Sequence, residues 1–207
     1  GEVVLEAVRQ DGRALCFAPD ELRADREVVL AAVAQNGHAL RFAAEELLDD
    51  RSVALAAARR SPSALRHAGA AVRGDRSAVL EVLAEAGGEA MEGAAAELLA
   101  DRSFILEAVG LKPEALQWAA APLQDDTELV LEAAAVAPTW VTGWLEARLW
   151  KTRREGSEQQ LARLLEIADA LGSLQPAIRV SPDAVVGARR RLRQLSRQGE
   201  GSEAKKK

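Results

Sequence analysis

The chain is poor in the residues that build sheets, disulfides and membrane spans. Among its 207 residues it has no tyrosine, 3% aromatic residues and a single cysteine, Cys16. Few aromatic residues and abundant alanine disfavour β-sheet and favour closely packed helices. Because one cysteine cannot form an internal disulfide, we expect a reducing interior, in the cytoplasm or on the matrix or stroma side of an organelle, rather than secretion.

Long apolar runs are also absent. The longest uncharged stretch near the middle of the chain covers residues 133–145 and is interrupted by Pro138. It is too short to cross a bilayer, so no transmembrane segment is predicted. The chain begins with Gly1 rather than Met, which leaves open a targeting segment upstream.

What the sequence has in their place is a repeat. The hexapeptide DREVVL at Asp25 returns, with changes, from Asp50, Asp75, Asp101 and Asp126. The period is therefore 25 residues, with one unit of 26 residues whose extra residue falls at Gly87-Gly88. A further unit precedes these five, since the chain opens one residue inside it. Twelve residues after each expected Asp comes a helix breaker: Gly12, Gly37, Pro62, Gly87, Pro113 and Pro138.

Each unit is predicted to fold as a hairpin of two short helices. Asp25 is expected to cap the first helix, with Glu27 suiting its dipole, and Gly37 to end it in the left-handed conformation. Apolar residues at helical spacing then mark the two buried faces: Val29, Ala32 and Val33 in the first helix, and Leu40, Ala43, Ala44 and Leu47 in the second.

Helices this short cannot bury their apolar faces alone, so neighbouring units must stack. We therefore predict an all-α fold: an α-solenoid of about six helical hairpins over residues 1–150, ending in a tryptophan-rich capping unit. A helical extension with a basic last helix is expected over residues 151–198, and a disordered tail over residues 199–207.

The stretch DREVVLAAVAQNGHALRFAAEELLDD resembles the bacterial and algal tandem repeat catalogued as domain of unknown function 4116. The resemblance covers roughly the first two thirds of the chain. The later units depart from it at Ser61-Pro62, where Asn-Gly is lost, and at His67 and Gly93, where the aromatic residue is lost. The resemblance implies the repeat fold and brings no known activity.

The repeat changes character at its sixth unit. Trp140 and Trp144 stand where other units have small residues such as Ala39 and Ala43, and Trp150 follows. Bulky residues at close-packing positions mark the end of the array. Two interpretations remain open: the indoles close the core as a cap, or they form an aromatic docking patch for a partner.

The C-terminal third carries two more predicted helices. A capping box of Ser157 and Gln160 starts the first, and Gly172 is expected to stop it. Ser181-Pro182-Asp183 starts the second. One face of this last helix is apolar, and the opposite face carries Arg189, Arg190, Arg193 and Arg197. Net charge also divides here, at −11 for residues 1–138 and +6 for residues 139–207.

The arginine-rich helix has several interpretations. It can fold on the acidic surface of the protein itself, or dock to an acidic protein surface, to RNA or to an anionic membrane. Nucleic acid is the weaker alternative, because the whole chain is acidic and no aromatic residue interleaves with the arginines.

No residue pattern indicates catalysis, a metal or a cofactor. His67 occupies the repeat position of Phe17, Phe42 and Trp118, which indicates a core aromatic position, and neither His67 nor His38 has ligand spacing with the other or with Cys16. Asp49-Asp50 and Asp125-Asp126 lie at unit boundaries, where capping explains them. We find no phosphate loop and no nucleophile elbow, and therefore predict that the chain is not an enzyme.

The predicted function is a non-catalytic protein–protein interaction or scaffold module, as a peripheral subunit of a larger assembly. Other protein subunits are its expected partners, with the tryptophans and the arginine-rich helix as candidate contacts. The alternative is association with nucleic acid or an anionic membrane surface through the arginine-rich helix and the Lys205–Lys207 tail.

Overall fold

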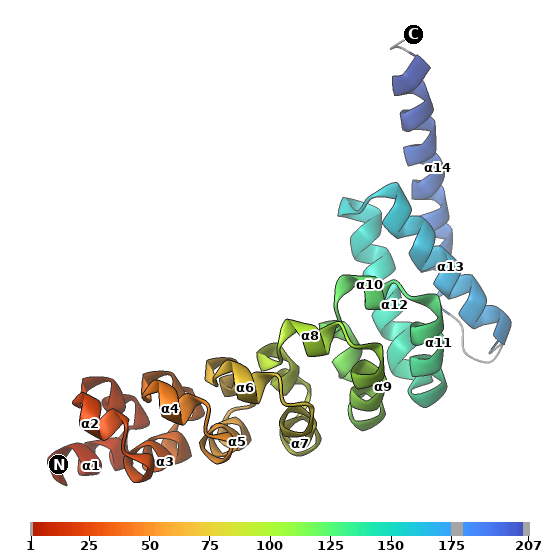
Figure 1. Ribbon diagram of the computed structural model, residues 1–207. Helices are drawn as coiled ribbons and strands as arrows, with labels where there is room; N and C mark the ends of the chain where they lie inside the picture. The colour runs from red at the N-terminus through yellow and green to blue at the C-terminus, as the bar shows by residue number, and fades with distance from the viewer. Residues whose placement is uncertain (1, 175–179, 205–207) are drawn as a thin grey trace. The chain divides into compact units, whose positions relative to one another are not determined.

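The computed structural model describes residues 2–174 and 180–204 and divides the chain into two compact units, residues 1–120 and 121–207 (Figure 1). The described residues contain helices in a periodic arrangement and no strand. The all-α repeat solenoid predicted from the sequence is therefore confirmed. None of the described helices is long and apolar enough to cross a membrane.

In the first unit each repeat contains three helical segments rather than two. An α-helix comes first: α1 (Glu2–Gln10), α3 (Arg26–Gln35), α5 (Arg51–Arg60), α7 (Arg76–Ala86) and α9 (Arg102–Leu111). A 3₁₀ helix follows: η1 (Gly12–Phe17), η2 (Gly37–Phe42), η3 (Pro62–His67), η4 (Gly88–Gly93) and η5 (Pro113–Trp118). A one-turn α-helix follows the first four of these: α2 (Asp20–Arg23), α4 (Glu45–Leu48), α6 (Ala70–Arg73) and α8 (Ala96–Leu99).

The second helix of each hairpin was predicted as one continuous element, and this was wrong. Between Leu40 and Leu47 the backbone is extended at Ala43 (φ −66°, ψ 157°) and Ala44 (φ −66°, ψ 154°). The extension lets the Ala44 N–H donate to the carbonyl oxygen of Arg23 in the preceding repeat, at 2.9 Å. The same link recurs from Gly69 to Leu48, from Ala95 to Arg73 and from Ala120 to Leu99. The break in the helix thus ties successive repeats together through the backbone.

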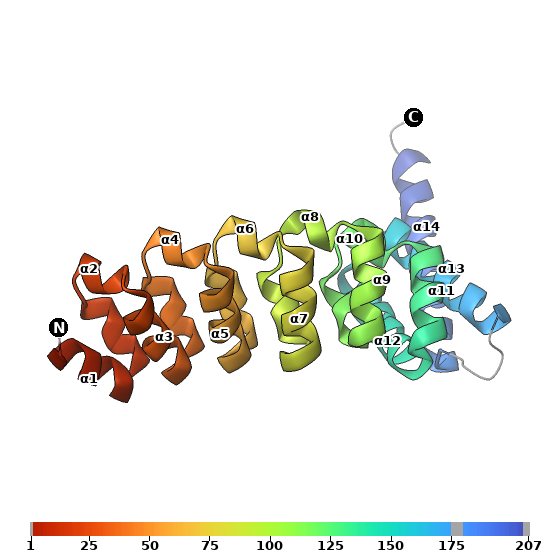
Figure 2. The same cartoon turned by 60° about the horizontal axis from the view of Figure 1, so that its bottom comes forward.

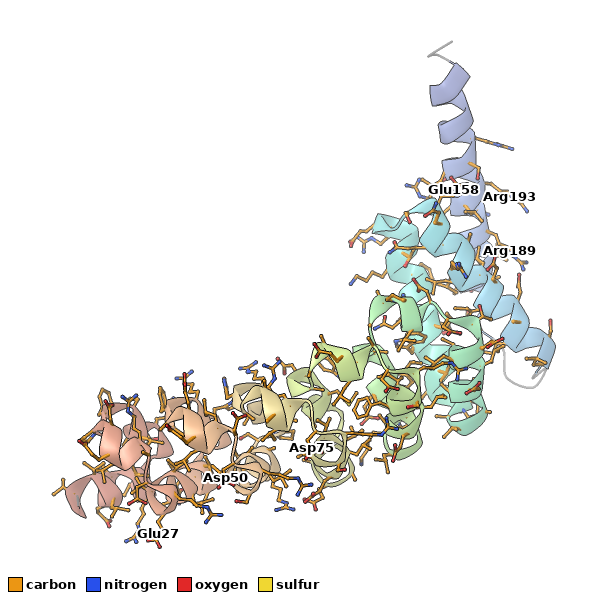
Figure 3. All side chains as sticks on the ribbon, in the orientation of Figure 1. Glu27, Asp50, Asp75, Glu158, Arg189 and Arg193 are labelled. Atoms are coloured by element: carbon orange, nitrogen blue, oxygen red, sulfur yellow. The ribbon has the colours of Figure 1, made fainter. Side chains whose placement is uncertain are left out.

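The predicted aspartate caps are present. The Asp25 carboxylate accepts hydrogen bonds from the N–H groups of Glu27 and Val28, and Asp50 and Asp75 cap α5 and α7 in the same way (Figure 3). The side chains of Val29, Ala32 and Val33 are buried, as the periodicity predicted. Figure 2 shows the long helices α3, α5, α7 and α9 side by side, each against the next.

The left-handed conformation predicted for Gly37 at the end of the first helix was wrong. Gly37 does not have a positive φ. Among the described residues only Gly87 does, at φ 104°. Gly37 is buried where η2 begins to pack on α5, so its role is close approach. Gly87 lies in the 26-residue unit, where it takes up the extra residue before η4.

The second unit contains α10 (Ala121–Gln124), α11 (Thr127–Val136), α12 (Pro138–Glu155), α13 (Glu158–Leu174) and α14 (Pro182–Ala204). From Pro138 onward a long α-helix replaces the 3₁₀ segment. The predicted capping box is present, since Ser157 and Gln160 exchange hydrogen bonds of 3.3 Å. Gly172 lies inside α13 rather than ending it.

Helix α14 begins at Pro182, as the sequence predicted, and packs against α12 and α13. It is described as helix to Ala204, which takes it into the segment predicted as a disordered tail from residue 199. Lys205–Lys207 lie outside the described residues, as does Pro176 of the predicted linker.

Candidate partner-binding surfaces

The tryptophans of α12 lie at the edges of the buried face of this helix, and aliphatic residues lie along the middle of that face. Val141, Leu145 and Leu149 hold the fully buried positions. Trp140 and Trp144 are half-buried and stack on each other, with ring centroids 6.3 Å apart. Trp150 is 46% exposed and lies 4.1 Å from the guanidinium of Arg153. The structure therefore brings two of the three indoles together, and their role in partner binding stays a prediction.

Arg148 anchors this tryptophan pair. Its guanidinium lies 4.9 Å from the ring of Trp144 and donates to the Gln124 carbonyl oxygen and to the Asp125 carboxylate, at 2.7 and 2.8 Å. Asp126 caps α11 through the Leu129 N–H, as predicted for the boundary aspartates. Asp49 accepts instead from the Ala71 N–H of the next repeat, at 3.3 Å. These carboxylates have structural partners.

The arginines of α14 divide into two groups. Arg189, labelled in Figure 3, donates from its Nη2 to both carboxylate oxygens of Asp169 in α13, at 2.6 and 2.8 Å. Arg190, Arg193 and Arg197 are exposed and form no ion pair with any side chain that the structure describes. Folding of the helix on the protein's own surface accounts for Arg189, whereas a docking role for the other three stays a prediction.

The sequence analysis missed a second surface, formed where the 3₁₀ helices stack. His38 Nδ1 lies 3.4 Å from His67 Nε2, and the two rings meet edge to face with centroids 5.6 Å apart. The sequence separation of 29 residues hid this pair. The sequence nevertheless contained a signal. The separation of 29 residues is one repeat period of 25 plus four residues, which places the two histidines at nearby positions of neighbouring 3₁₀ helices.

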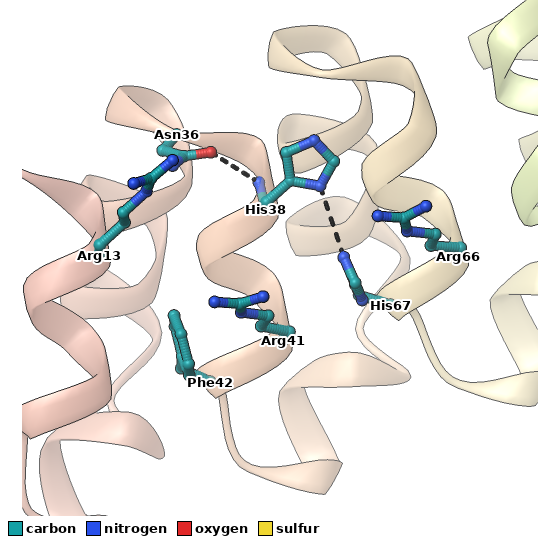
Figure 4. Close-up of a pocket in the computed structure, with 7 residues that line it drawn as sticks. All are labelled: Arg13, Asn36, His38, Arg41, Phe42, Arg66 and His67. Atoms are coloured by element: carbon teal, nitrogen blue, oxygen red, sulfur yellow. Dashed lines mark hydrogen bonds between the residues drawn. The ribbon is translucent and has the colours of Figure 1, made fainter.

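The histidines line a cleft of about 260 Å³ across three successive repeats (Figure 4). Arg13 comes from η1, Arg41 and Phe42 from η2, and Arg66 from η3. Asn36 fixes the start of η2 by accepting a hydrogen bond from the His38 N–H, at 3.1 Å. The repeat spacing thus gathers basic side chains that are far apart along the chain.

The cleft carries positive charge that the described residues do not neutralise. Arg66 pairs with Glu92 at 2.9 Å. Arg41 lies over the Phe42 ring at 4.5 Å, and neither Arg41 nor Arg13 forms an ion pair with a described carboxylate. Several arginines of the long helices differ, because they pair with acidic residues of the next repeat: Arg26 with Asp50, Arg51 with Asp75 and Arg59 with Glu85.

The electrostatics of the cleft keep His67 uncharged at neutral pH. Burial lowers the pKa of His67, and the positive charges of Arg66, His38 and Arg41 lower it further, against an opposing effect of Glu92. An uncharged His67 ring is consistent with the single hydrogen bond between the two rings, because its Nε2 can then either accept a hydrogen bond from its neighbour or donate one.

A metal fits this cleft poorly. Two imidazoles supply two ligands, but among the described residues no third histidine, cysteine or carboxylate joins them to make a cluster. Cys16 is half-buried and lies outside the lining of the cleft. The flanking guanidinium groups repel cations, so the arrangement suits an anion.

The aromatic positions of the 3₁₀ helices were predicted to be core positions, and this was wrong. Phe17 is 88% exposed, and Phe42, His67 and Trp118 are half-buried. The leucines before them take the core positions and are completely buried: Leu15, Leu40, Leu65 and Leu116. The aromatic position therefore lies on an outer surface, which we call the 3₁₀ face, formed by the side chains of η1 to η5 that point away from the core.

Charge inverts along the 3₁₀ face. The first three helices carry Arg13, Arg41 and Arg66 beside the histidines. The next two carry acidic residues at the corresponding places: Glu89, Glu92 and Glu114. The face is therefore basic over η1 to η3 and acidic over η4 and η5.

Comparison with known proteins finds a family whose model resembles the first repeats. Residues 2–48 and 25–73 match the model of the family described as Domain of unknown function (DUF4116). The two overlapping matches are offset by about one repeat, which confirms the resemblance seen in the sequence. No curated protein and no solved structure matches the chain.

Proposed function

We propose that this chain, whose residues 2–73 carry repeats of the DUF4116 family, is a non-catalytic protein-interaction or scaffold module. Its expected place is as a peripheral subunit of a larger assembly. The supporting observation is the 3₁₀ face, on which stacked helices present side chains that the core does not use. A continuous surface of this kind suits an extended partner, because each repeat adds one step of contact.

Phe17 carries the proposal. Phe17 is 88% exposed, so the core of its own repeat does not use the ring, and it lies on the same helix as Arg13 of the basic cleft. Exposed aromatic residues next to arginine are typical of the contacts that dominate protein interfaces. Phe42 extends this aromatic position to the next repeat, under the guanidinium of Arg41.

Affinity capture from native extract tests the proposal, with nuclease treatment and a high-salt wash before mass spectrometry. The variant Phe17→Ser removes the exposed ring. Its matched control is Val3→Ser, which removes an exposed apolar residue (83% exposed) from the long helix of the same repeat. We expect bound proteins that are retained by Val3→Ser and lost with Phe17→Ser. An identical set of bound proteins in both variants would contradict a role for the 3₁₀ face.

A second candidate function is association with nucleic acid or an anionic membrane through α14. The observation in its favour is that Arg190, Arg193 and Arg197 are exposed and have no described ion-pair partner. Binding of an oligonucleotide or of anionic vesicles should then weaken steeply between about 50 and 200 mM salt. It should also be lost when residues 181–207 are deleted and be retained in Arg189→Ala, because Arg189 already pairs with Asp169.

A further inference from the structure

We infer that the basic cleft of η1 to η3 is a recognition site for carboxylate groups on an acidic segment of a partner protein. The inference rests on the proposed function and names the chemistry that the 3₁₀ face recognises. Its starting point is a contrast between two groups of arginines in the first three repeats. The long-helix arginines Arg26, Arg51 and Arg59 are neutralised by the next repeat, whereas the cleft arginines Arg13 and Arg41 have no described carboxylate partner.

Arg41 is held ready for a ligand. Its guanidinium lies 4.5 Å from the centroid of the Phe42 ring, which restricts the side chain while leaving its N–H donors free. A planar guanidinium with free donors matches a carboxylate in a two-point geometry. Arg13 lines the same cleft from the preceding repeat, so two carboxylates of one segment can be bound at once.

The histidine pair adds a hydrogen-bond donor in either of its arrangements. If His38 Nδ1–H donates to His67 Nε2, the remaining proton of His67 is on its Nδ1. If His67 Nε2–H donates instead, the remaining proton of His38 is on its Nε2. One outer ring N–H is therefore always present in the cleft that the arginines also line.

The surroundings favour a short acidic segment over a long polyanion. Arg66, at the edge of the cleft, is already paired with Glu92, and the face continues into Glu89 and Glu114. A nucleic acid that followed the face beyond η3 would bring its phosphates against these carboxylates, in a chain whose net charge is −5. Localised carboxylates on an otherwise neutral or basic segment avoid this repulsion.

The inference is tested by fluorescence anisotropy on the purified full chain. The probe is a fluorescein-labelled peptide in which Glu alternates with Gly and Ser, and the reference is the same peptide with Gln in place of Glu. Variants Arg13→Ala and Arg41→Ala remove the free guanidinium groups at exposed positions that do not hold the fold together. Arg59→Ala is the matched control, because it removes the same charge from the long-helix side of the protein.

We expect the Glu peptide to bind more tightly than the Gln peptide. Each cleft variant should lower its affinity about tenfold to a hundredfold, as the loss of charge-assisted hydrogen bonding implies, with Arg59→Ala close to wild type. His67→Phe supplies a second test. It places at position 67 the phenylalanine that Phe17 and Phe42 provide at the same position of earlier repeats. The variant should therefore keep the fold while binding the Glu peptide more weakly.

Five results would overturn the inference. The Glu peptide fails to bind at concentrations up to about 1 mM, which marks the limit of useful affinity. The Gln peptide binds equally well. The Arg59→Ala control loses as much affinity as the cleft variants, which would make binding a matter of overall charge. A single-stranded oligonucleotide binds the cleft more tightly than the peptide, which would make the occupant a nucleic acid. Light scattering shows self-association that Arg41→Ala abolishes, which would make the occupant a second copy of the chain.

Failure here and failure of the proposed function are distinguishable. If the 3₁₀ face captures a partner that Phe17→Ser loses, but Arg13→Ala and Arg41→Ala leave both that capture and the peptide result unchanged, the module stands and the carboxylate chemistry is wrong. If neither Phe17→Ser nor the arginine variants change what is captured, the 3₁₀ face is not the interaction surface.

Discussion

Gly37 packs against the main chain of the next repeat so closely that a Cβ atom on it would lie 2.3 Å from the carbonyl oxygen of Ala57. Gly12 has the same relation to the carbonyl oxygen of Ala32, one repeat earlier. The repeats therefore stack at a distance that the absence of a side chain sets. Because the obstacle is backbone, it cannot rotate away as a side chain would.

Gly37→Ala is therefore expected to destabilise the protein. The new methyl group must push η2 away from α5, at a cost of about 2 kcal/mol or more in the free energy of unfolding. Urea unfolding followed by circular dichroism measures it. Gly110→Ala is the control, since a Cβ there meets nothing within 4 Å and Gly110 lies in helix α9. That change should raise the free energy of unfolding by about 0.5–1 kcal/mol, and equal losses in both variants would contradict the packing argument.

Asp50, at the start of α5, serves two repeats at once. It caps α5 and also accepts a hydrogen bond from the Nε of Arg26 in the preceding repeat, at 3.3 Å. Asp25 caps α3 only, because the residue that corresponds to Arg26 one repeat earlier is Gly1. Asp25→Ala should cost about 1 kcal/mol of folding free energy as the loss of a cap. Asp50→Ala should cost about 0.2–1 kcal/mol more, because it also breaks an exposed ion pair.

The comparison of Asp50→Ala with Arg26→Ala separates these two effects in urea unfolding. Arg26→Ala removes the ion pair and leaves the Asp50 cap, so it should cost less than either aspartate variant. If Arg26→Ala and Asp50→Ala destabilised equally, capping would contribute nothing and the assignment of the aspartates would be wrong.

The free energy of unfolding should fall as the pH drops below 6.5, the ordinary pKa of a histidine side chain. The pKa of His67 in the folded chain is lowered from 6.5, chiefly by burial and then by Arg66, His38 and Arg41. The unfolded chain binds the proton more readily, so the stabilisation present above pH 6.5 is lost as the pH falls from that value through the folded-state pKa. Thermal melts between about pH 7 and 5.5 measure the slope, in the range where histidine titrates.

His67→Phe should flatten that slope, because it removes the titrating group and keeps an aromatic ring at a position where Phe17 and Phe42 stand in earlier repeats. A melting temperature that depends on pH equally in both proteins would show that His67 is not the group responsible.

In the second unit, stability should depend on the aliphatic residues of α12 more than on its indoles. Leu145 is completely buried, whereas Trp144 is half-buried and stacked on Trp140. Leu145→Ala is expected to cost about 2–5 kcal/mol of folding free energy through the cavity that it leaves. Trp144→Ala should cost less, and the near-ultraviolet circular dichroism of the stacked pair should be lost with it. The reverse order of stabilities would support the indoles as the core of the cap.

The repeat could be predicted because the period, the caps and the buried leucines are local or strictly periodic. Asp25 meets its partners within three residues, and Leu40 recurs at a fixed place in each unit. The break at Ala43 and Ala44 could not be predicted in the same way, since its cause is a carbonyl group of the preceding repeat. An alanine-rich stretch at helical spacing gives no sign of that partner.

The basic cleft was missed for a related reason. His38 and His67 were compared along the chain, where no ligand spacing links them, and not across the stack, where they lie 3.4 Å apart. Phe17 was assigned to the core because an aromatic residue at a fixed repeat position is usually buried. In these repeats the preceding leucine fills the core, and the aromatic position faces outward.

The inversion of charge along the 3₁₀ face gives that face a direction. An extended segment lying across η1 to η5 meets arginines at one end and glutamates at the other. A segment whose own charge changes sign along its length can then bind in one orientation and is repelled in the opposite one. The order of the repeats would in this way determine which end of a bound chain points toward the N-terminus of the array.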